Sequence, residues 1–433
     1  MSTHRRTFLQ QAGLATAALS LAGSVSADDA ADPIIVGVIG PGGMGTHHLE
    51  QLVQRKDARI AYVCDVDQTR LAKAAKFVEE KTGKAPKSVK DLREVLDDKA
   101  VKAVWIATPD HWHAPATILA ADAGKHVYVE KPCCHNLREG RLMTDAARRN
   151  KVVVQTGTQT RSSKHAIEAM QRLHGGAIGE VLVSKAWNSQ LRRNIGKIQP
   201  SEPPAYLDFD LWLGPAPKVP YRSNMLPGIW RWWYDFGTGD MGNDGVHDLD
   251  LARWGLDVET LPTRVAALGG KYFFDDDQQF PDTQYVIFEY APSEKGKAPK
   301  QLIFEQRIWS PYFQEGFENG NAFYGTKGML ILGKSGGWKL YAPRNKLVEE
   351  MAGKPDLPAH HQNFLDCIRS GKLPNADVEI GHFSAALCHL GNIATRVGRQ
   401  LTVDPKGETI ANDPEAAAMV RRKYREHWAT PKG

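Results

Sequence analysis

The sequence predicts an α/β protein of two domains: an N-terminal, doubly wound parallel sheet and a C-terminal α+β domain with an open, mostly antiparallel sheet. Strand and helix patterns alternate regularly from residue 34 to about residue 155, as they do in successive βαβ units. Beyond residue 157, longer strands follow one another without regular intervening helices. We therefore assign residues 32–157 to the first domain and residues 158–433 to the second.

The elements of the first domain are short apolar runs separated by amphipathic segments. Each run is typical of a strand that is buried on both faces of a parallel sheet. Strands are expected at residues 34–39, 59–64, 103–107, 126–129 and 152–155, and helices at 68–81, 114–123 and 137–149.

The second domain is expected to contain longer strands whose residues partly alternate between apolar and polar. They cover residues 181–188, 264–268, 284–290, 301–307 and 329–332. Helical periodicity returns at residues 360–370 and 381–397. We expect these C-terminal helices to pack back on the first domain.

The composition indicates large globular cores and gives no sign of a nucleic-acid partner. The chain has 433 residues, of which 42% are hydrophobic and 24% are charged. The net charge of +5 is small and the basic residues are scattered, so nucleic acid is not expected to bind. Five cysteines without a C-x-x-C pair predict neither a disulfide scaffold nor a metal site.

A glycine-rich turn after the first strand predicts a dinucleotide site. Residues 34–39 lead directly into G-x-G-x-x-G, with Gly40, Gly42 and Gly45 in the three positions and Gly43 and Met44 between them. The first glycine permits a tight turn, the second lets the backbone approach a pyrophosphate, and the third lets the following helix pack closely. The alternative is a glycine turn in a fold that binds no nucleotide.

The second strand ends at an acidic residue that favours NAD over NADP. Asp65 lies 20 residues after Gly45, where a carboxylate accepts hydrogen bonds from the adenosine ribose. A carboxylate there repels a 2′-phosphate, and Val66 and Asp67 offer no arginine clamp. Arg70 is the nearest cation, and we expect it to face outward.

The extreme N-terminus resembles a twin-arginine export signal. Arg5 and Arg6 precede an apolar stretch over residues 12–25, and Val25-Ser26-Ala27 offers a small-x-small cleavage site. Residues 1–31 are therefore expected to lie outside the fold and to direct the folded protein to the periplasm. Export after folding suits an enzyme that loads its dinucleotide in the cytoplasm. The alternative is an uncleaved N-terminal anchor.

Two loops at the predicted carboxyl ends of the strands carry polar side chains. Residues 108–113 read Thr-Pro-Asp-His-Trp-His, and Glu130-Lys131-Pro132 directly follows a strand. A lysine beside a nicotinamide ring could have a lowered pKa and exchange a proton with substrate. The alternative is a solvated lysine at a strand end.

A second candidate segment follows the turn Gly237-Thr238-Gly239 and is expected to form one helix reaching Trp254. On that helix Asp240, Asn243 and His247 would share a face, which makes His247 a general acid or base candidate. The alternatives are a buried histidine paired with a carboxylate, or a metal site formed with Asp240 and Asp244, which we weigh less.

Four aromatic residues lie within residues 230–234, before the glycine turn. Aromatic faces pack against sugar C–H groups, so this segment could form a sugar platform, although it could also be core. The candidate substrate-binding residues are Arg161, Trp230, Trp232, Tyr234 and Asp244.

Together these motifs resemble the glucose–fructose oxidoreductase, inositol dehydrogenase and rhizopine-catabolism (Gfo/Idh/MocA) family over nearly all of the chain after the signal. The resemblance rests on the first glycine motif, Thr108-Pro109 with His113, Glu130-Lys131-Pro132, His247 after its glycine turn, and Gly325-Thr326-Lys327-Gly328, expected on a late strand. It implies a Rossmann domain with tightly held NAD or NADP, sugar or polyol substrates, and a homo-oligomer. Lys131 and His247 would act on the reacting hydroxyl.

The chain departs from the family at Asn243, where an aspartate is frequent. An amide can orient a hydroxyl but cannot transfer a proton, so Asp240 and Asp244 become candidates for the relay. Three hypotheses remain open: an NAD(P)-dependent oxidoreductase of sugars, polyols or glycosides; a glycoside-cleaving or epimerising enzyme that recycles its own NAD; and a non-catalytic sugar or NAD sensor.

Overall fold

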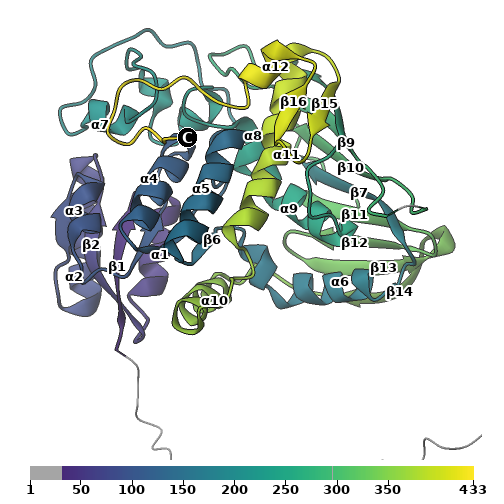
Figure 1. Cartoon of the computed structure of the whole chain (residues 1–433), viewed down its shortest axis with the longest axis horizontal. Coiled ribbons are helices and arrows are strands. Elements are labelled where there is room, and N and C mark those ends of the chain that lie inside the picture. The colour runs from purple at the N-terminus through teal and green to yellow at the C-terminus, as the bar shows by residue number, and fades with distance from the viewer. Residues whose placement is uncertain (1–31, 295) are drawn as a thin grey trace, which may run out of the picture.

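The computed structural model describes residues 32–294 and 296–433, and the candidate export signal lies outside them. Two sheets form the molecule, one in each predicted domain, with helix α11 (Val378–Val397) between them (Figure 1). The α/β fold class predicted from the sequence is confirmed. Among the described residues, none of the helices has the length and apolar character needed to cross a membrane.

The first sheet has six parallel strands in the order β3-β2-β1-β4-β5-β6. In this doubly wound order, β1 and β4 are neighbours. Successive strands are added on one side of β1 up to β3 and on its other side from β4 onward, so a crevice forms at the carboxyl ends of β1 and β4. The strands are β1 (Ile34–Ile39), β2 (Ala58–Cys64), β3 (Lys87–Val89), β4 (Ala103–Ile106), β5 (His126–Val129) and β6 (Val154–Thr156). The sequence had indicated neither β3 nor the short helix after it, because their apolar runs are only a few residues long.

Five helices accompany the first sheet: α1 (Met44–Leu52), α2 (Gln68–Thr82), α3 (Leu92–Asp97), α4 (Asp110–Asp122) and α5 (Leu137–Asn150). Helix α4 begins at Asp110, four residues before the predicted start. Asp110 suits the first turn, since a carboxylate there interacts favourably with the helix dipole. The loop that the sequence placed after β4 is thus largely the first turn of α4.

The second sheet has ten strands in the order β14-β13-β12-β11-β7-β10-β9-β8-β15-β16. Only β7 and β10 pair in parallel; the other neighbours are antiparallel. The strands are β7 (Val181–Asn188), β8 (Arg264–Gly270), β9 (Thr283–Tyr290), β10 (Lys300–Arg307), β11 (Asn319–Gly325), β12 (Met329–Gly333), β13 (Gly337–Ala342), β14 (Lys346–Met351), β15 (Leu401–Asp404) and β16 (Thr409–Ala411).

The expectation that residues 325–328 lie on a strand holds only for Gly325, the last residue of β11. The backbone N–H of Gly325 donates to the carbonyl of Gly328 at 2.9 Å, and residues 326–328 form the turn between β11 and β12. A Cβ at Gly325 would lie 2.2 Å from the carbonyl oxygen of Ile178. The glycine is therefore required by close backbone approach.

Helices cover one face of the second sheet. Helix α9 (Gly245–Leu256) crosses β7, β10 and β11, α11 packs on β8, and α6 (Lys164–His174) packs on β12 and β13. The opposite face exposes large apolar side chains, including Leu268 on β8, Ile287 on β9 and Tyr324 on β11.

Segments from the C-terminal half also reach the first domain. Phe364 of α10 (Leu357–Ser370) makes edge-to-face contacts with Trp105 and Tyr128 of the first sheet, at centroid distances of 5.1 and 6.0 Å. Helix α11 packs on α5. After α12 (Pro414–Ala418) the chain crosses to the region of α7 (Phe209–Leu213) above the first sheet (Figure 1).

Candidate active site

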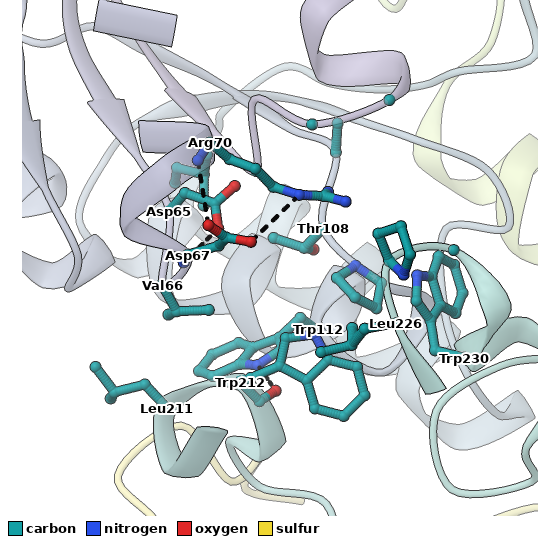
Figure 2. A pocket seen from close by; sticks show the side chains of 18 of the residues that line it. Asp65, Val66, Asp67, Arg70, Thr108, Trp112, Leu211, Trp212, Leu226 and Trp230 are labelled. Carbon is teal, nitrogen blue, oxygen red and sulfur yellow. Dashed lines mark hydrogen bonds and ion pairs between the residues drawn. The ribbon is translucent and has the colours of Figure 1, made fainter. Parts of the chain in front are cut away.

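A cavity of about 700 Å³ lies at the carboxyl ends of β1, β2, β4 and β5. Its floor is the glycine turn and the polar loops of the first domain, and its roof is formed by residues 204–231 of the second domain together with Trp428. Volumes of this size are typical of cofactor sites. Figure 2 shows Asp65, Asp67 and Arg70 on one side and the indole rings of Trp112, Trp212 and Trp230 on the others.

The glycine turn has the geometry that a pyrophosphate requires. Gly40 has φ 79°, and a Cβ at Gly45 would lie 2.1 Å from the carbonyl oxygen of Gly40. Helix α1 begins at Met44, so its N-terminus, the positive end of the helix dipole, lies at the cavity that Gly42, Gly43 and Met44 line. The residues present therefore fit a dinucleotide.

Asp65 lies at the end of β2, and its carboxylate accepts the backbone N–H of Asp67 at 2.9 Å. Burial raises the pKa of Asp65 to about 6, although the hydrogen bond from Asp67 opposes the shift. The carboxyl is thus charged above that pH and faces the cavity, where a ribose can bind it (Figure 2).

The expectation that Arg70 faces outward was wrong. Its side chain lies over the glycine turn, where a Cβ at Gly42 would be 2.1 Å from Nη1. An ion pair of 3.6 Å with Asp67 holds it there (Figure 2). Arg70 can therefore contribute a positive charge at the phosphate end of the cavity.

Residues 204–213 close the adenosine end of the cavity from above. Backbone hydrogen bonds join Gln68 N–H to Tyr206 O at 2.9 Å and Asp208 N–H to Val66 O at 3.0 Å. An ion pair of 3.0 Å between Lys90 and Asp208 adds a third connection. The second domain is thus tied directly to the loop that follows β2.

Glu130 is held by a buried chain of polar side chains behind the cavity. His48 Nε2 lies 3.1 Å from Glu130 Oε1, and His48 Nδ1 lies 2.9 Å from Nε2 of His361 on α10. Gln159 donates to the same carboxylate oxygen at 3.0 Å. Burial alone would raise the pKa of Glu130, but the contact with His48 outweighs it and the pKa is below its ordinary value.

Lys131 lies directly after β5 with its ammonium group in the cavity. Its Nζ donates to the backbone carbonyl of Asn243 at 2.6 Å. Burial lowers the pKa of Lys131, and the charge of Glu130 opposes the shift. A lysine with a lowered pKa gives up its proton more readily than an exposed lysine and can serve as an acid or a base.

The predicted helix through His247 is broken at Asp244. Helix α8 (Gly239–Asn243) ends there and α9 begins at Gly245, since Asp244 has φ −118° and ψ −39°. Asp240 and His247 therefore do not share one continuous face. The break turns Asn243 into the cavity while Asp244 points away from it.

His247 is buried at the start of α9 and does not line the cavity. Burial lowers its pKa well below the ordinary value, and the charges of Lys334 and Lys131 act in the same direction. Its Nδ1 atom has no hydrogen-bond partner among the described residues. The ring is therefore neutral.

The two carboxylates proposed for a relay are engaged in ion pairs. Asp240 pairs with Arg192 at 3.0 Å and accepts a hydrogen bond from Asn243 at 2.8 Å. Asp244 pairs with Lys334 and, at 3.5 Å, with Arg192. Burial would raise the pKa of Asp244, but Lys334 overcomes it and holds the pKa well below its ordinary value. Asp244 is thus ionised and does not line the cavity.

Three other predicted substrate residues also lie elsewhere. Arg161 is buried, with its Nε 2.7 Å from Asp250 and its guanidinium 4.6 Å from the ring of Trp254, so it joins elements within the second domain. Trp232 belongs to a small apolar cluster, and Tyr234 packs on Phe280. Of the aromatic segment, Trp230 lines the cavity.

The cavity includes the other candidates and some that the sequence did not single out. Its lining contains Gly40, Gly42, Gly43, Met44, Asp65, Thr108, Pro109, His113, Glu130, Lys131, Trp230 and Asn243. Gly45 does not line the cavity, but its lack of a side chain allows helix α1 to pack closely against Gly40. The added residues are Arg231, Trp112, Trp212 and Trp428. Arg231 lay within the quoted aromatic segment, whereas Trp428 has no local sequence signal because it arrives from the far end of the chain.

No group of side chains among the described residues could hold a metal ion. The metal alternative with Asp240, Asp244 and His247 therefore has no geometric support. Their acidic groups are bound by Arg192 and Lys334 instead.

Comparisons with known proteins agree with this architecture. Residues 34–158 match the model of the Gfo/Idh/MocA oxidoreductase family's NAD-binding Rossmann fold, and residues 183–285 and 325–430 match the model of its C-terminal α/β domain. Inositol 2-dehydrogenase 2 of Saccharopolyspora erythraea is 26% identical over 390 residues, which cover 86% of this chain and 96% of that protein. A glycosyl hydrolase family 109 protein of Shewanella baltica is 28% identical over 207 residues, covering 42% of this chain and 45% of the relative.

Solved structures show the same fold at low identity. A levoglucosan dehydrogenase in complex with NADH and levoglucosan aligns over 86% of this chain and 99% of its own, with a TM-score of 0.64 and 18% identity. The aldose–aldose oxidoreductase of Caulobacter crescentus aligns over 86% of this chain and all of its own, with a TM-score of 0.65 and 18% identity. The chain therefore belongs to the Gfo/Idh/MocA family of oxidoreductases and carries that family's NAD-binding Rossmann domain.

Proposed function

We propose that the protein oxidises a secondary hydroxyl of a sugar, polyol or glycoside to a carbonyl, with NAD as the hydride acceptor. The observation that carries the proposal is the position of Lys131, desolvated at the end of β5 in the same cavity as the glycine turn. The names of the relatives, which include inositol and levoglucosan dehydrogenases, support carbohydrate substrates. When bound, NAD supplies the electrophilic carbon that accepts hydride.

Each polar residue has one task in the proposed reaction. Lys131 accepts the hydroxyl proton at Nζ, since its burial lowers the pKa and so favours the neutral amine over the ammonium. Asn243 orients the substrate hydroxyl, as its amide is fixed between Asp240 and Arg231. His247 contributes a neutral imidazole behind Lys131. Trp230 offers its ring to the sugar face.

The experiment is a screen of sugars, polyols and glycosides, with mass spectrometry of the products and of any co-purified nucleotide. Loss of two hydrogens from the substrate with one NADH formed is expected. Cleavage of a glycoside without net NADH would instead establish the redox-neutral alternative. Binding without turnover, unchanged in a Lys131→Met variant, would establish the sensor.

We further propose export to the periplasm by the twin-arginine route. Support comes from Arg5 and Arg6 before the apolar stretch over residues 12–25. Replacement of both arginines by lysine is expected to leave the protein and its nucleotide in the cytoplasmic fraction. Unchanged export of that variant would exclude the twin-arginine route.

A homo-oligomer, a dimer or tetramer, completes the proposal. The open face of the second sheet exposes Leu268, Ile287 and Tyr324, and a second copy would cover them. Sedimentation of the wild type and of an Ile287→Glu variant tests this proposal. A monomeric wild type, or an assembly that the variant does not weaken, would exclude this face as the interface.

A further inference from the structure

Two cations in the cavity, Arg231 and Lys131, form no ion pair with any described carboxylate. The Nε atom of Arg231 donates to Oδ1 of Asn243 at 2.9 Å, and its Nη1 donates to the carbonyl of Gly228. Lys131 donates to the backbone carbonyl of Asn243 at 2.6 Å. Both cationic groups thus meet at one residue, and all three residues line the cavity.

The carboxylates around this point are engaged with other partners. Glu130 contacts His48 at 3.1 Å, and Asp110 accepts the hydroxyl of Thr238 at 2.7 Å. Asp240 and Asp244 pair with Arg192 and Lys334. None of these acids compensates the charges of Lys131 and Arg231 by direct contact. A desolvated charge without a partner is costly, so the site favours an anion supplied from outside.

Asn243 maintains this excess of positive charge. Its side-chain oxygen holds Arg231 and its amide donates to Asp240 at 2.8 Å, so the residue aligns the guanidinium without adding a negative charge. An aspartate at the same position would hold Arg231 equally well and would neutralise it. The amide therefore aligns the cation and leaves its charge available.

The guanidinium of Arg231 is held in place for a planar ligand. The ring of Trp230 lies 4.7 Å from its centre, which restricts the side chain. Of the five N–H donors of an arginine, those on Nη2 form no hydrogen bond with the described residues, and Arg231 faces the cavity. Free donors on a guanidinium that is held in place match a carboxylate.

We propose that the substrate is a sugar acid, whose carboxylate binds Arg231 while its reacting hydroxyl faces Lys131. This proposal rests on the oxidoreductase function proposed above and specifies its substrate class as an aldonate, a uronate or a uronoside. Lys131 must be free to take a proton, so the carboxylate is assigned to Arg231. The positive nicotinamide of bound NAD would add to the attraction.

The test compares two ligands that differ only in the acid group. Methyl glucoside and the corresponding methyl glucuronoside are titrated into NADH-loaded protein by calorimetry, and both are assayed as substrates with NAD. Hydrogen bonds to a charged group predict that the acid binds about ten- to a hundredfold more tightly than the neutral ligand. Equal affinities, or a stronger interaction with the neutral ligand, would overturn the proposal.

Variants assign the preference to Arg231. Arg231→Met is expected to abolish it, Arg231→Lys to keep part of it, and Asn243→Asp to shift it toward the neutral ligand. Arg70→Met is the matched control, since Arg70 lines the same cavity at the phosphate end. It should weaken NADH binding and leave the preference intact. A preference that survives in Arg231→Met would reject the assignment, provided that the variant retains the wild-type Tm.

The two proposals fail in different ways. Selective binding of the acid without oxidation of either ligand would reject the reaction and keep the anion site. Oxidation of the neutral ligand alone would keep the reaction and reject the anion site. A glucose 6-phosphate titration serves as a third arm, and preference for the phosphate over the carboxylate would reject a sugar acid as the ligand class.

Discussion

In the proposed reaction, Lys131 is better placed than any carboxylate to exchange the proton of the substrate. Its Nζ lies in the cavity, whereas Asp240 and Asp244 are engaged in ion pairs behind it. Glu130 accepts the backbone N–H of Lys131 at 3.3 Å, and the backbone carbonyl of Asn243 accepts its ammonium at 2.6 Å, so these two residues hold the lysine in position. A single proton-accepting group is sufficient for the proposed oxidation.

Lys131→Met should stop hydride transfer while NAD still binds. General-base groups contribute about a hundredfold or more, so kcat should fall by at least about that factor. Single-turnover formation of NADH measures it, and nucleotide binding is followed by calorimetry. Lys102→Met, on the exposed end of a loop, is the control. Near-normal turnover of the Lys131 variant would show that another group accepts the proton.

Asp65 is predicted to lower the unfolding free energy of the protein, although it favours binding of NAD over NADP. The pKa of Asp65 is about 6 in the folded protein and 3.8 ordinarily. Folding therefore disfavours the charged carboxylate, and the cost in stability grows as the pH rises from 3.8 to 6 and is complete above pH 6. Asp65→Asn should therefore raise the unfolding free energy at pH 7.5 by about 2–3 kcal/mol, and the gain should disappear as the pH falls toward 4. Denaturant unfolding across that pH range measures the effect.

The same substitution should weaken NAD binding and reduce its advantage over NADP. The wild type is expected to prefer NAD, because the charged Asp65 repels a 2′-phosphate. Arg70, lying over the glycine turn, limits that discrimination but is itself paired with Asp67. Equal affinity of the wild type for both nucleotides would contradict this interpretation.

At the scale of elements, the break between α8 and α9 decides which side chains face the cavity. A continuous helix would have placed Asp240, Asn243 and His247 in one row. The break at Asp244 instead leaves Asn243 in the cavity and directs Asp244 to Lys334, in the turn between β12 and β13. The ion pair thus attaches the junction of α8 and α9 to the β12–β13 turn.

Asp244→Asn should lower stability without altering the pH profile of kcat. Loss of the carboxylate leaves Lys334 without its partner at a site where the two side chains are 23% and 11% exposed. We expect a loss of about 2 kcal/mol, less than for a fully buried pair. The pKa of Asp244 lies below its ordinary value, so this contribution is present above pH 3.8 and declines as the pH falls below it.

The control is Asp275→Asn, which breaks the exposed Lys197–Asp275 pair and should cost less than about 1 kcal/mol. Equal losses in the two variants would show that burial adds nothing at Asp244. Disappearance of one limb of the kcat profile in Asp244→Asn would instead make Asp244 a proton carrier.

The sequence was informative where a local pattern determines a structure. The glycine turn, the strand ending at Asp65 and the loop Glu130-Lys131-Pro132 each combine a turn with an apolar strand, and the sheet topology then brings them together. The position of Arg161 was not predictable, because its partner Asp250 is 89 residues away. The break at Asp244 occurs where that residue pairs with Lys334, 90 residues away in the sequence, and helix propensity does not register such a contact.

At the scale of the molecule, the cavity is closed by parts of both domains. The segment over residues 204–213 is connected to the chain after β2 by two backbone hydrogen bonds, and to the loop after β3 by the Lys90–Asp208 pair. Trp428 arrives from the other end of the chain. Because these segments cover the cavity, release of a bound nucleotide should be slow relative to release from an open cleft.

Asp208→Ala should accelerate NADH release. The substitution removes both the ion pair with Lys90 and the cap of α7, where Asp208 accepts the N–H of Leu211 at 3.1 Å. A cap and an exposed pair are together worth about 1–2 kcal/mol, which predicts an off-rate roughly five- to thirtyfold higher. Stopped-flow fluorescence with excess ADP-ribose as a trap measures it. Glu415→Ala, on distant α12, should leave the rate unchanged.

The shared roof also has a calorimetric consequence. A dinucleotide that touches the glycine turn below and residues 204–231 above binds only when both domains are folded and docked. Its binding free energy therefore couples the unfolding of the first domain to the unfolding of the second. Scanning calorimetry should show the two domains unfolding in a single transition when saturated with NADH, and this transition should separate into two as the nucleotide is withdrawn.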